Sequence, residues 1–213
     1  MRPRVEHERR APEEAGGPEP RLFIAVPLAE VARAAIQALV DEVRGIVEAN
    51  AREPRSQVRW VRMDGLHLTL RFLGPTHAAR IPALSRALSD VAAATETFRV
   101  EIRGSGAFPS SGRPRSIWLG IDEGHDELAA LAARLGDRLA DEGVPRDDRP
   151  FRAHLTLARS DGRREGPLVA RTLAARAAES SIPFTSDRAV LFESLTGGGP
   201  ARYVAVHEAP FRE

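Results

Sequence analysis

The tetrapeptide His67-Leu68-Thr69-Leu70 occurs a second time as His154-Leu155-Thr156-Leu157. Side chains along a β-strand alternate between its two faces, so residues two apart share a face and lie about 6.6 Å apart. In each copy the histidine and the threonine therefore share one face, and the two leucines point the other way into a core. Two such units in one chain predict duplicated halves of a pseudo-symmetric fold, meeting so that both polar faces line a common cleft.

The repeated histidines can be interpreted in two ways. A single histidine in an apolar strand is usually a core residue with satisfied nitrogens, and threonine favours strands without any functional reason. The repeat changes this interpretation, because a core histidine has no cause to reappear with the same neighbours at the same offset from a threonine. We therefore treat His67 and His154 as candidate catalytic residues.

Two histidines at one cleft match the chemistry of phosphodiester cleavage. One group must take a proton from the attacking oxygen, and another must protonate the departing oxygen. Histidine can fill either role near neutral pH, because its unperturbed pKa is about 6.5. Thr69 and Thr156 would each donate a hydroxyl hydrogen bond to a nonbridging phosphate oxygen.

The segments around the repeat predict alternating strands and helices. Strands are expected over residues 21–26, 58–63, 67–73, 98–108, 116–121, 151–159, 184–193 and 202–208, and helices over 28–48, 81–94, 126–142 and 168–178. Residues 98–108 and 116–121 should form a hairpin. The alternation suggests a two-layer α/β or α+β arrangement. Residues 1–20, rich in arginine, glutamate and proline, predict a disordered tail.

Composition excludes several classes of protein. All 31 basic residues are arginine, which excludes P-loop enzymes, pyridoxal enzymes and ATP-dependent nucleic-acid ligases, because each needs a lysine. The absence of cysteine excludes disulfides and thiolate nucleophiles and suits a cytoplasmic location. The net charge of +1 leaves no broad field to hold duplex nucleic acid. No apolar run or secretory signal indicates a membrane.

The other histidines do not predict a metal site. His7, His77, His125 and His207 have no partner at metal-ligand spacing, and no His-Glu-x-x-His sequence occurs. We therefore expect a protein that needs no metal.

Several segments together resemble a known family, the two-histidine (2H) phosphoesterases, and within it the RNA 2′,3′-cyclic phosphodiesterases, also called 2′-5′ RNA ligases. The resemblance runs from about Arg21 to Phe211. It rests on the two His-x-Thr-x motifs and on the segments 21–27, 67–74, 108–109, 118–120, 151–159 and 191–194. One departure is Ala153, where the family typically has proline.

The resemblance implies an α+β fold of two pseudo-symmetric lobes of mainly antiparallel sheet, with outer helices and an active-site cleft between the lobes. Residues 21–213 would form this single bilobal domain. It also implies that water opens an RNA 2′,3′-cyclic phosphate end to a 2′-phosphomonoester without a metal or nucleotide cofactor, and that the reverse reaction gives 2′-5′ joining. No membrane or protein partner is implied, and we expect a monomer.

The resemblance also implies roles for individual residues. His67 would donate a proton to the leaving 3′ oxygen, and His154 would activate water. Thr69 and Thr156 would contact the phosphate, and Arg159 would be a further anion contact. Strict alternation places Arg159 on the face opposite His154, so this contact requires a bulge or a strand end.

The sequence is also compatible with other functions. A related enzyme could act on small cyclic phosphates such as ADP-ribose 1″,2″-cyclic phosphate, or on 2′-5′ oligoadenylates. A non-catalytic module could keep the site only to bind RNA ends. Phe151 or Trp60 could stack on a base, although core packing is the simpler interpretation of both.

Overall fold

The computed structural model describes residues 19–50, 58–163, 165–195, 197 and 201–213. Of the predicted tail, residues 1–18 lie outside this range. The strands are β1 (Arg21–Pro27), β2 (Arg59–Trp60), β3 (His67–Pro75), β4 (Phe98–Phe108), β5 (Ser116–Ile121), β6 (His154–Arg159), β7 (Ser181–Ser186), β8 (Arg188–Leu195) and β9 (Arg202–Pro210). The helices are α1 (Glu30–Asn50), α2 (Ile81–Ala93), α3 (His125–Asp141) and α4 (Glu165–Ala177), with short 3-10 turns at Met63–Gly65 and Ala78–Arg80.

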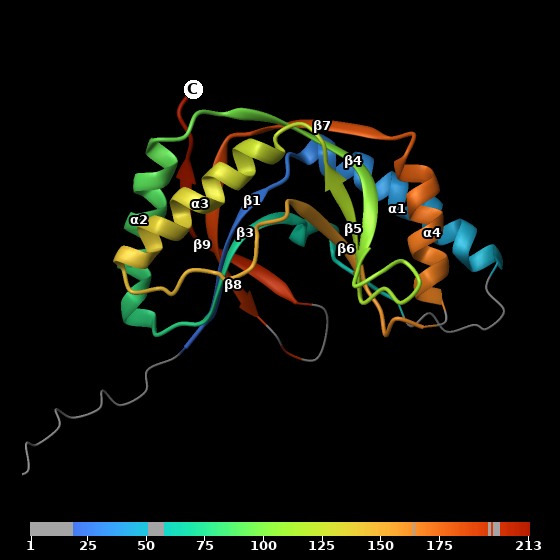
Figure 1. Ribbon diagram of the computed structural model, residues 1–213, viewed down its shortest axis with the longest axis horizontal. Coiled ribbons are helices and arrows are strands. Elements are labelled where there is room, and N and C mark those ends of the chain that lie inside the picture. The colour runs from blue at the N-terminus through green and yellow to red at the C-terminus, as the bar shows by residue number, and fades with distance from the viewer. Residues whose placement is uncertain (1–18, 51–57, 164, 196, 198–200) are drawn as a thin grey trace, which may run out of the picture.

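The strands form two antiparallel sheets, one for each copy of the repeat. Sheet A has the order β3-β1-β8-β9 and contains the first motif in β3, whereas sheet B has the order β2-β6-β5-β4-β7 and contains the second motif in β6. The predicted hairpin of β4 and β5 is confirmed. Figure 1 shows the two sheets side by side with helices outside them, which confirms the predicted two-lobed α+β fold.

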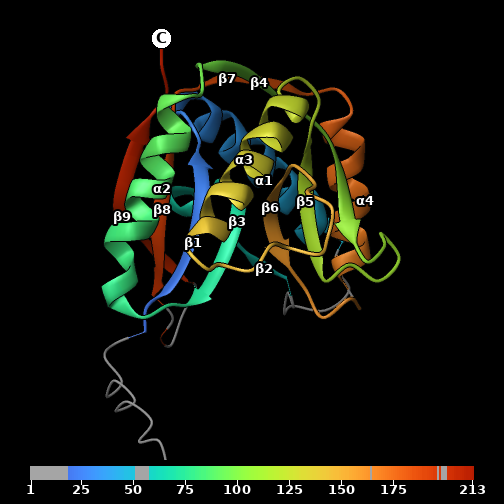
Figure 2. The same ribbon diagram turned by 60° about the vertical axis from the view of Figure 1, so that its left-hand side comes forward.

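Two of the helices, α1 and α3, cross from the sheet that precedes them to the other lobe. Helix α1 follows β1 of sheet A but contacts α4 and β7, and α4 contacts β4, so this pair covers sheet B. Helix α3 follows β5 of sheet B but contacts α2 and β3, and α2 contacts β8 and β9. Figure 2 shows α2 and α3 together over sheet A. Each lobe therefore depends on a helix supplied by the other half of the chain.

Each sheet buries the face that its helices cover. The leucines of both motifs, Leu68, Leu70, Leu155 and Leu157, are buried in the core, as the alternation predicted. Helix α3 buries Leu128, Leu131, Leu135 and Leu139 at helical spacing. Because the leucines point toward the helices, the histidines and threonines of the motifs point away from them.

The prediction of one strand over residues 184–193 is wrong. The chain forms β7 in sheet B up to Ser186 and then β8 in sheet A from Arg188. Strand β7 buries every second residue, whereas β8 buries Ala189, Val190 and Leu191 in succession. At the break, the carbonyl of Asp187 accepts a hydrogen bond of 2.7 Å from the Phe211 amide. The sequence does not reveal this break, because neither glycine nor proline marks the change of sheet.

The strands before and within the second motif also differ from the prediction. Strand β2 contains only Arg59 and Trp60, and β6 begins at His154 rather than at Phe151. The 3-10 turn at Met63–Gly65 ends the extended segment early. Each histidine is therefore the first residue of its strand.

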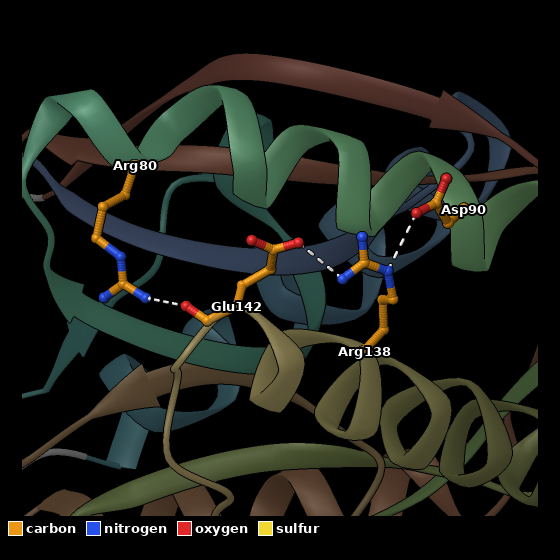
Figure 3. A network of polar contacts seen from close by, with 4 residues as sticks. All are labelled: Arg80, Asp90, Arg138 and Glu142. Atoms are coloured by element: carbon orange, nitrogen blue, oxygen red, sulfur yellow. Dashed lines mark hydrogen bonds and ion pairs between the residues drawn. The ribbon is translucent and has the colours of Figure 1, made fainter.

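A polar network joins α2 to the end of α3 (Figure 3). Arg138 contacts Asp90 of α2 at 3.1 Å and the Glu142 carboxylate at 2.8 Å, while the Arg80 guanidinium donates a 2.7 Å hydrogen bond to the Glu142 carbonyl. Carbonyls in the last turn of a helix lack helical partners, so this bond satisfies one of them. The network fixes the point where the chain leaves α3 toward β6.

Arg71 of β3 holds the next part of the same connection. Its Nη2 donates a hydrogen bond to the carbonyl of Pro145, and its Nη1 lies 3.8 Å from a carboxylate oxygen of Asp147. The strand that bears the first motif therefore contacts the segment that leads into the second motif.

Candidate active site

His67 is anchored through one ring nitrogen at the start of β3. Its Nδ1 lies 2.7 Å from the carbonyl oxygen of Gly65, at the end of the 3-10 turn. A carbonyl can only accept, so Nδ1 carries the hydrogen, and the neutral ring keeps its lone pair on Nε2. The turn before the strand therefore selects the tautomer.

His154 has the same arrangement at the start of β6. Its Nδ1 lies 2.7 Å from the carbonyl oxygen of Arg152. Within the described parts of the chain, the Nε2 atoms of His67 and His154 have no hydrogen-bond partner. Both histidines are half-buried, so each presents one reactive nitrogen to a ligand.

Aromatic rings of sheet A surround the imidazole of His67. Its ring centroid lies 4.7 Å from that of Phe23 and 5.0 Å from that of Tyr203, which meets it edge-on. Phe192 lies 6.3 Å away. Such contacts restrict the orientation of the imidazole and keep water from one side of it.

Aromatic rings of sheet B surround His154 in a similar way. Phe108 lies 5.3 Å and Trp118 6.0 Å from it, both in edge-on geometry. The indole of Trp118 passes over Gly106, where an added Cβ would come within 2.3 Å of the ring. Glycine at this position is therefore required for Trp118 to reach His154.

The two histidines interact electrostatically across the sheets. Burial lowers the pKa of His67 below its usual value of 6.5, the hydrogen bond to the Gly65 carbonyl raises it, and the charge of His154 lowers it. Strands β3 and β6 are also in contact. The structure thus brings the two predicted histidines together from separate sheets.

Both predicted threonines lie on the histidine faces. Thr69 is opposite Ala25, two positions from the pair of His67 with Pro27, and Thr156 is opposite Trp118. Both are half-buried. No hydrogen bond from either hydroxyl to another described residue is present, which leaves both groups free to bind a phosphate oxygen.

Arg159 lies on the same face as His154 because of a bulge. The register shifts between Ile117 and Trp118, and Leu157 and Ala158 are buried in succession. Arg159 is opposite Ser116, which is two residues before Trp118 on β5. Directly opposed residues share a face, so the side chain of Arg159 returns to the histidine face.

The two candidate stacking residues are partly buried at the edge of the core. Trp60 and Phe151 both pack against the buried hydrophobic cluster. Trp60 is opposite the buried Ala158, and the Arg44 guanidinium of α1 lies 4.9 Å from its ring. Core packing is therefore confirmed for both.

The sequence prediction missed the aromatic residues that surround the imidazoles. Strand alternation places Trp118 beside Thr156 once β5 is paired with β6, but the pairing itself is not evident from the sequence. Phe23 and Tyr203 come from strands far from His67 in the chain, so only the sheet order brings them together.

The described residues contain no group of three histidine, cysteine or acidic side chains arranged to hold a metal ion. Their helices also lack the combination of length and apolar character that a membrane span requires.

Two imidazoles with available Nε2 atoms, each beside a free threonine hydroxyl, are the arrangement that a two-histidine phosphoesterase requires. The chain belongs to the 2'-5' RNA ligase superfamily, whose family model matches residues 31–198.

Individual relatives agree with this membership. The chain is 34% identical to an RNA 2',3'-cyclic phosphodiesterase of Archaeoglobus fulgidus over 150 residues, covering 70% of this chain and 77% of the relative. It is 37% identical to one of Thermus thermophilus over 147 residues, covering 65% and 68%.

Solved structures share the fold over almost their whole length. The crystal structure of TT0787 of Thermus thermophilus superposes with a TM-score of 0.69 at 26% identity, covering 90% of this chain and 98% of that one. Escherichia coli LigT complexed with 3'-AMP gives 0.67 at 25% identity, covering 92% and 99%.

Proposed function

We propose that this protein hydrolyses RNA 2′,3′-cyclic phosphate ends to 2′-phosphomonoesters by two-histidine acid-base catalysis. The observation that carries the proposal is the shared anchoring of His67 and His154, which leaves two Nε2 atoms available on interacting rings. Relatives named RNA 2',3'-cyclic phosphodiesterase support the choice of substrate.

The proposed reaction needs one neutral and one protonated imidazole. Neutral His154 takes a proton from water as the water oxygen bonds to phosphorus. The bond from phosphorus to the 3′ oxygen breaks, and protonated His67 gives its proton to that oxygen. Thr69 and Thr156 hold nonbridging oxygens. If an RNA 5′-hydroxyl attacks in place of water, the same steps give a 2′-5′ linkage.

The lowered pKa of His67 bears on its role as the acid. Burial favours the neutral ring in the free protein. A cyclic phosphate carries a negative charge, and this charge favours the protonated ring when the substrate is bound. His67 would therefore take up its proton together with the substrate.

An end-group assay tests the proposal. The protein is incubated with an oligoribonucleotide ending in 2′,3′-cyclic phosphate, with a chelator present, and the ends are identified as 2′- or 3′-phosphate. We expect a 2′-phosphate, because a proton donor at the 3′ oxygen makes it the leaving group. An intact cyclic end, or activity that the chelator abolishes, would contradict the proposal.

The same assay separates the alternative functions. ADP-ribose 1″,2″-cyclic phosphate and 2′-5′ oligoadenylates are supplied beside the RNA, and the highest kcat/KM identifies the substrate class. A binding module would instead bind the cyclic end without turnover, and its function would survive replacement of either histidine.

The cellular setting is part of the proposal. We propose that the protein acts as a cytoplasmic monomer on RNA ends without a protein partner. Light scattering at working concentration tests the oligomeric state, and cell fractionation tests the location.

A further inference from the structure

Trp118 lies over a glycine of the neighbouring strand. Gly106 of β4 is directly opposite Trp118 of β5, so both residues share one face of sheet B. A Cβ added to Gly106 would come within 2.3 Å of two carbons of the indole. The indole therefore occupies the space that a side chain at position 106 would fill, and its ring centroid lies 6.0 Å from that of His154.

Tyr203 has the same relationship to a glycine in sheet A. A Cβ added to Gly65 would come within 3.0 and 3.2 Å of two carbons of the Tyr203 ring. Tyr203 meets the imidazole of His67 edge-on, with the ring centroids 5.0 Å apart. Each lobe thus combines a glycine, an aromatic ring seated on it and a histidine. This arrangement lies outside the sequence repeat, because Trp118 precedes its motif and Tyr203 follows the other one.

The backbone does not require glycine at either position. Within the described ranges, the glycines with positive φ are Gly74, Gly104, Gly124, Gly143 and Gly162. Gly106 and Gly65 adopt backbone angles that other residues can also adopt. A glycine within a strand weakens the strand and often marks a place where another group approaches closely. What these two glycines provide is space for the rings above them.

One hydrogen bond does not fix the orientation of an imidazole. The contact of Nδ1 with a backbone carbonyl sets the tautomer of each histidine, but the terminal torsion of a histidine side chain has broad energy wells. The ring can therefore still tilt, and Nε2 moves with it. An aromatic ring packed against the imidazole opposes this motion. Alignment matters for the rate, because a misplacement of about 1 Å can cost roughly 10²-fold.

Packing alone does not explain an indole at position 118. The Nε1 atom of Trp118 is buried and has no hydrogen-bond partner in the described part of the chain, and an unpaired buried donor destabilises the folded state. A phenyl ring would fill apolar space without this cost. The longer indole is the ring that extends across Gly106.

We propose that Trp118 and Tyr203 are positioning residues for His154 and His67, and that each depends on the missing side chain of Gly106 or Gly65. This inference rests on the proposed function and deepens it, because it names what aligns the two Nε2 atoms. The rings act through the imidazoles and not through the substrate. They should therefore determine kcat and leave KM unchanged.

The test displaces the indole without removing it. Gly106→Ala adds one methyl group where the indole lies, and Trp118→Leu removes the indole. Gly136→Ala is the control, because an added Cβ at this site in α3 meets nothing within 4 Å. We would measure kcat and KM for an oligoribonucleotide ending in 2′,3′-cyclic phosphate, at a temperature well below the melting temperature of every variant.

Gly106→Ala and Trp118→Leu should each lower kcat about 100-fold with unchanged KM, and Gly136→Ala should match the wild type. Adding Gly106→Ala to Trp118→Leu should cause no further loss, because the ring that the methyl group displaces is already absent. Two independent structural defects would instead have additive effects.

A second pair of variants separates the ring of Tyr203 from its hydroxyl. Tyr203→Leu should lower kcat about 100-fold, and Tyr203→Phe should recover most of this loss because it keeps the ring. Gly65→Ala should have a smaller effect than Gly106→Ala, since its Cβ would approach the ring only to 3.0 Å rather than 2.3 Å. Equal losses in Tyr203→Phe and Tyr203→Leu would overturn this positioning role in favour of a substrate contact by the hydroxyl.

Unchanged kcat in Trp118→Leu, or a loss confined to KM, would overturn the inference and leave the proposed function intact. NMR provides a readout that does not depend on turnover. The imidazole C–H resonances of His154 should shift in Gly106→Ala and stay in place in Gly136→Ala. If the wild type hydrolyses no cyclic end, the proposed function fails, and the NMR shifts then decide whether the indole holds the imidazole.

Discussion

His67 and His154 make the same contact with the backbone, because each places Nδ1 2.7 Å from the carbonyl oxygen of the residue two positions earlier. The repeat seen in the sequence is therefore also a repeat of side-chain geometry. A buried core histidine would use both nitrogens within the protein, whereas these two use only one. The contact fixes which nitrogen meets a substrate.

Replacing either histidine by alanine should reduce turnover of cyclic-ended RNA by about 10²- to 10⁴-fold, the usual contribution of a positioned acid or base. The double variant should lose little more than the worse single variant, because the two groups act as a unit. Single-turnover rates measure both effects. His125→Ala, at an exposed site on α3, is the control and should retain activity. Full activity in either His67→Ala or His154→Ala would refute the paired mechanism.

The pKa of His67 should rise when His154 is replaced by alanine. The charge of His154 lowers this pKa, so its removal takes away one of the two causes that favour the neutral ring. Burial remains, and the value should stay below 6.5. NMR titration of the imidazole protons measures the change. A pKa of His67 that does not move would show that the two rings do not interact.

The same lowered pKa predicts how stability depends on pH. Between the folded-state pKa of His67 and its unfolded value of about 6.5, the unfolded chain binds more protons, so stability increases with pH in this window. The contribution of His67 is fully present above 6.5 and is lost as pH falls through the folded-state pKa. In His67→Gln, the decrease in melting temperature between pH 7.5 and 5.5 should be smaller than in the wild type.

Thr69→Val and Thr156→Val should each lower kcat/KM by about 10- to 100-fold, because a hydrogen bond to a charged group contributes about 1.5–3 kcal/mol. Valine keeps the shape of threonine and favours strands, so the melting temperature should not fall. Thr172→Val, on α4, is a control outside both sheets. Unaltered kcat/KM in both motif variants would remove the hydroxyls from the proposed site.

The sequence predicted the parts of the site that follow from strand alternation. The outward histidines and threonines and the buried leucines needed only the period of two along each motif. Arg159 shows the limit of this reasoning, since its face depends on the bulge opposite Ile117 and Trp118. A bulge changes the period without leaving a residue type that marks it.

Long-range pairing was the part that local patterns could not reveal. The break at Asp187 moves the chain from sheet B to sheet A with no glycine or proline, and the partnership of Arg59 with Arg159 exists only because β2 adds to the edge of β6. Such features depend on which strands become neighbours, and many sheet orders satisfy the same local pattern.

Local sequence patterns do not predict the contacts between the lobes either. The contact made by Arg71 can be tested by substitution. Its side chain is only 12% exposed, and it reaches the carbonyl of Pro145 and the carboxylate of Asp147. Arg71→Ala should lower the free energy of unfolding by about 1–3 kcal/mol, because it removes a hydrogen bond from a charged donor. Urea denaturation measures this loss.

A matched control for Arg71→Ala is Arg99→Ala, which removes an exposed ion pair with Glu123 and should change stability by no more than about 0.5 kcal/mol. Because the segment held by Arg71 leads to His154, kcat should fall in Arg71→Ala even under conditions where the protein is fully folded. Arg71→Lys keeps the charge but lacks the planar fork of donors, so it should recover only part of the stability. If Arg71→Ala is as stable and as active as Arg99→Ala, the contact between the lobes does not position the second histidine.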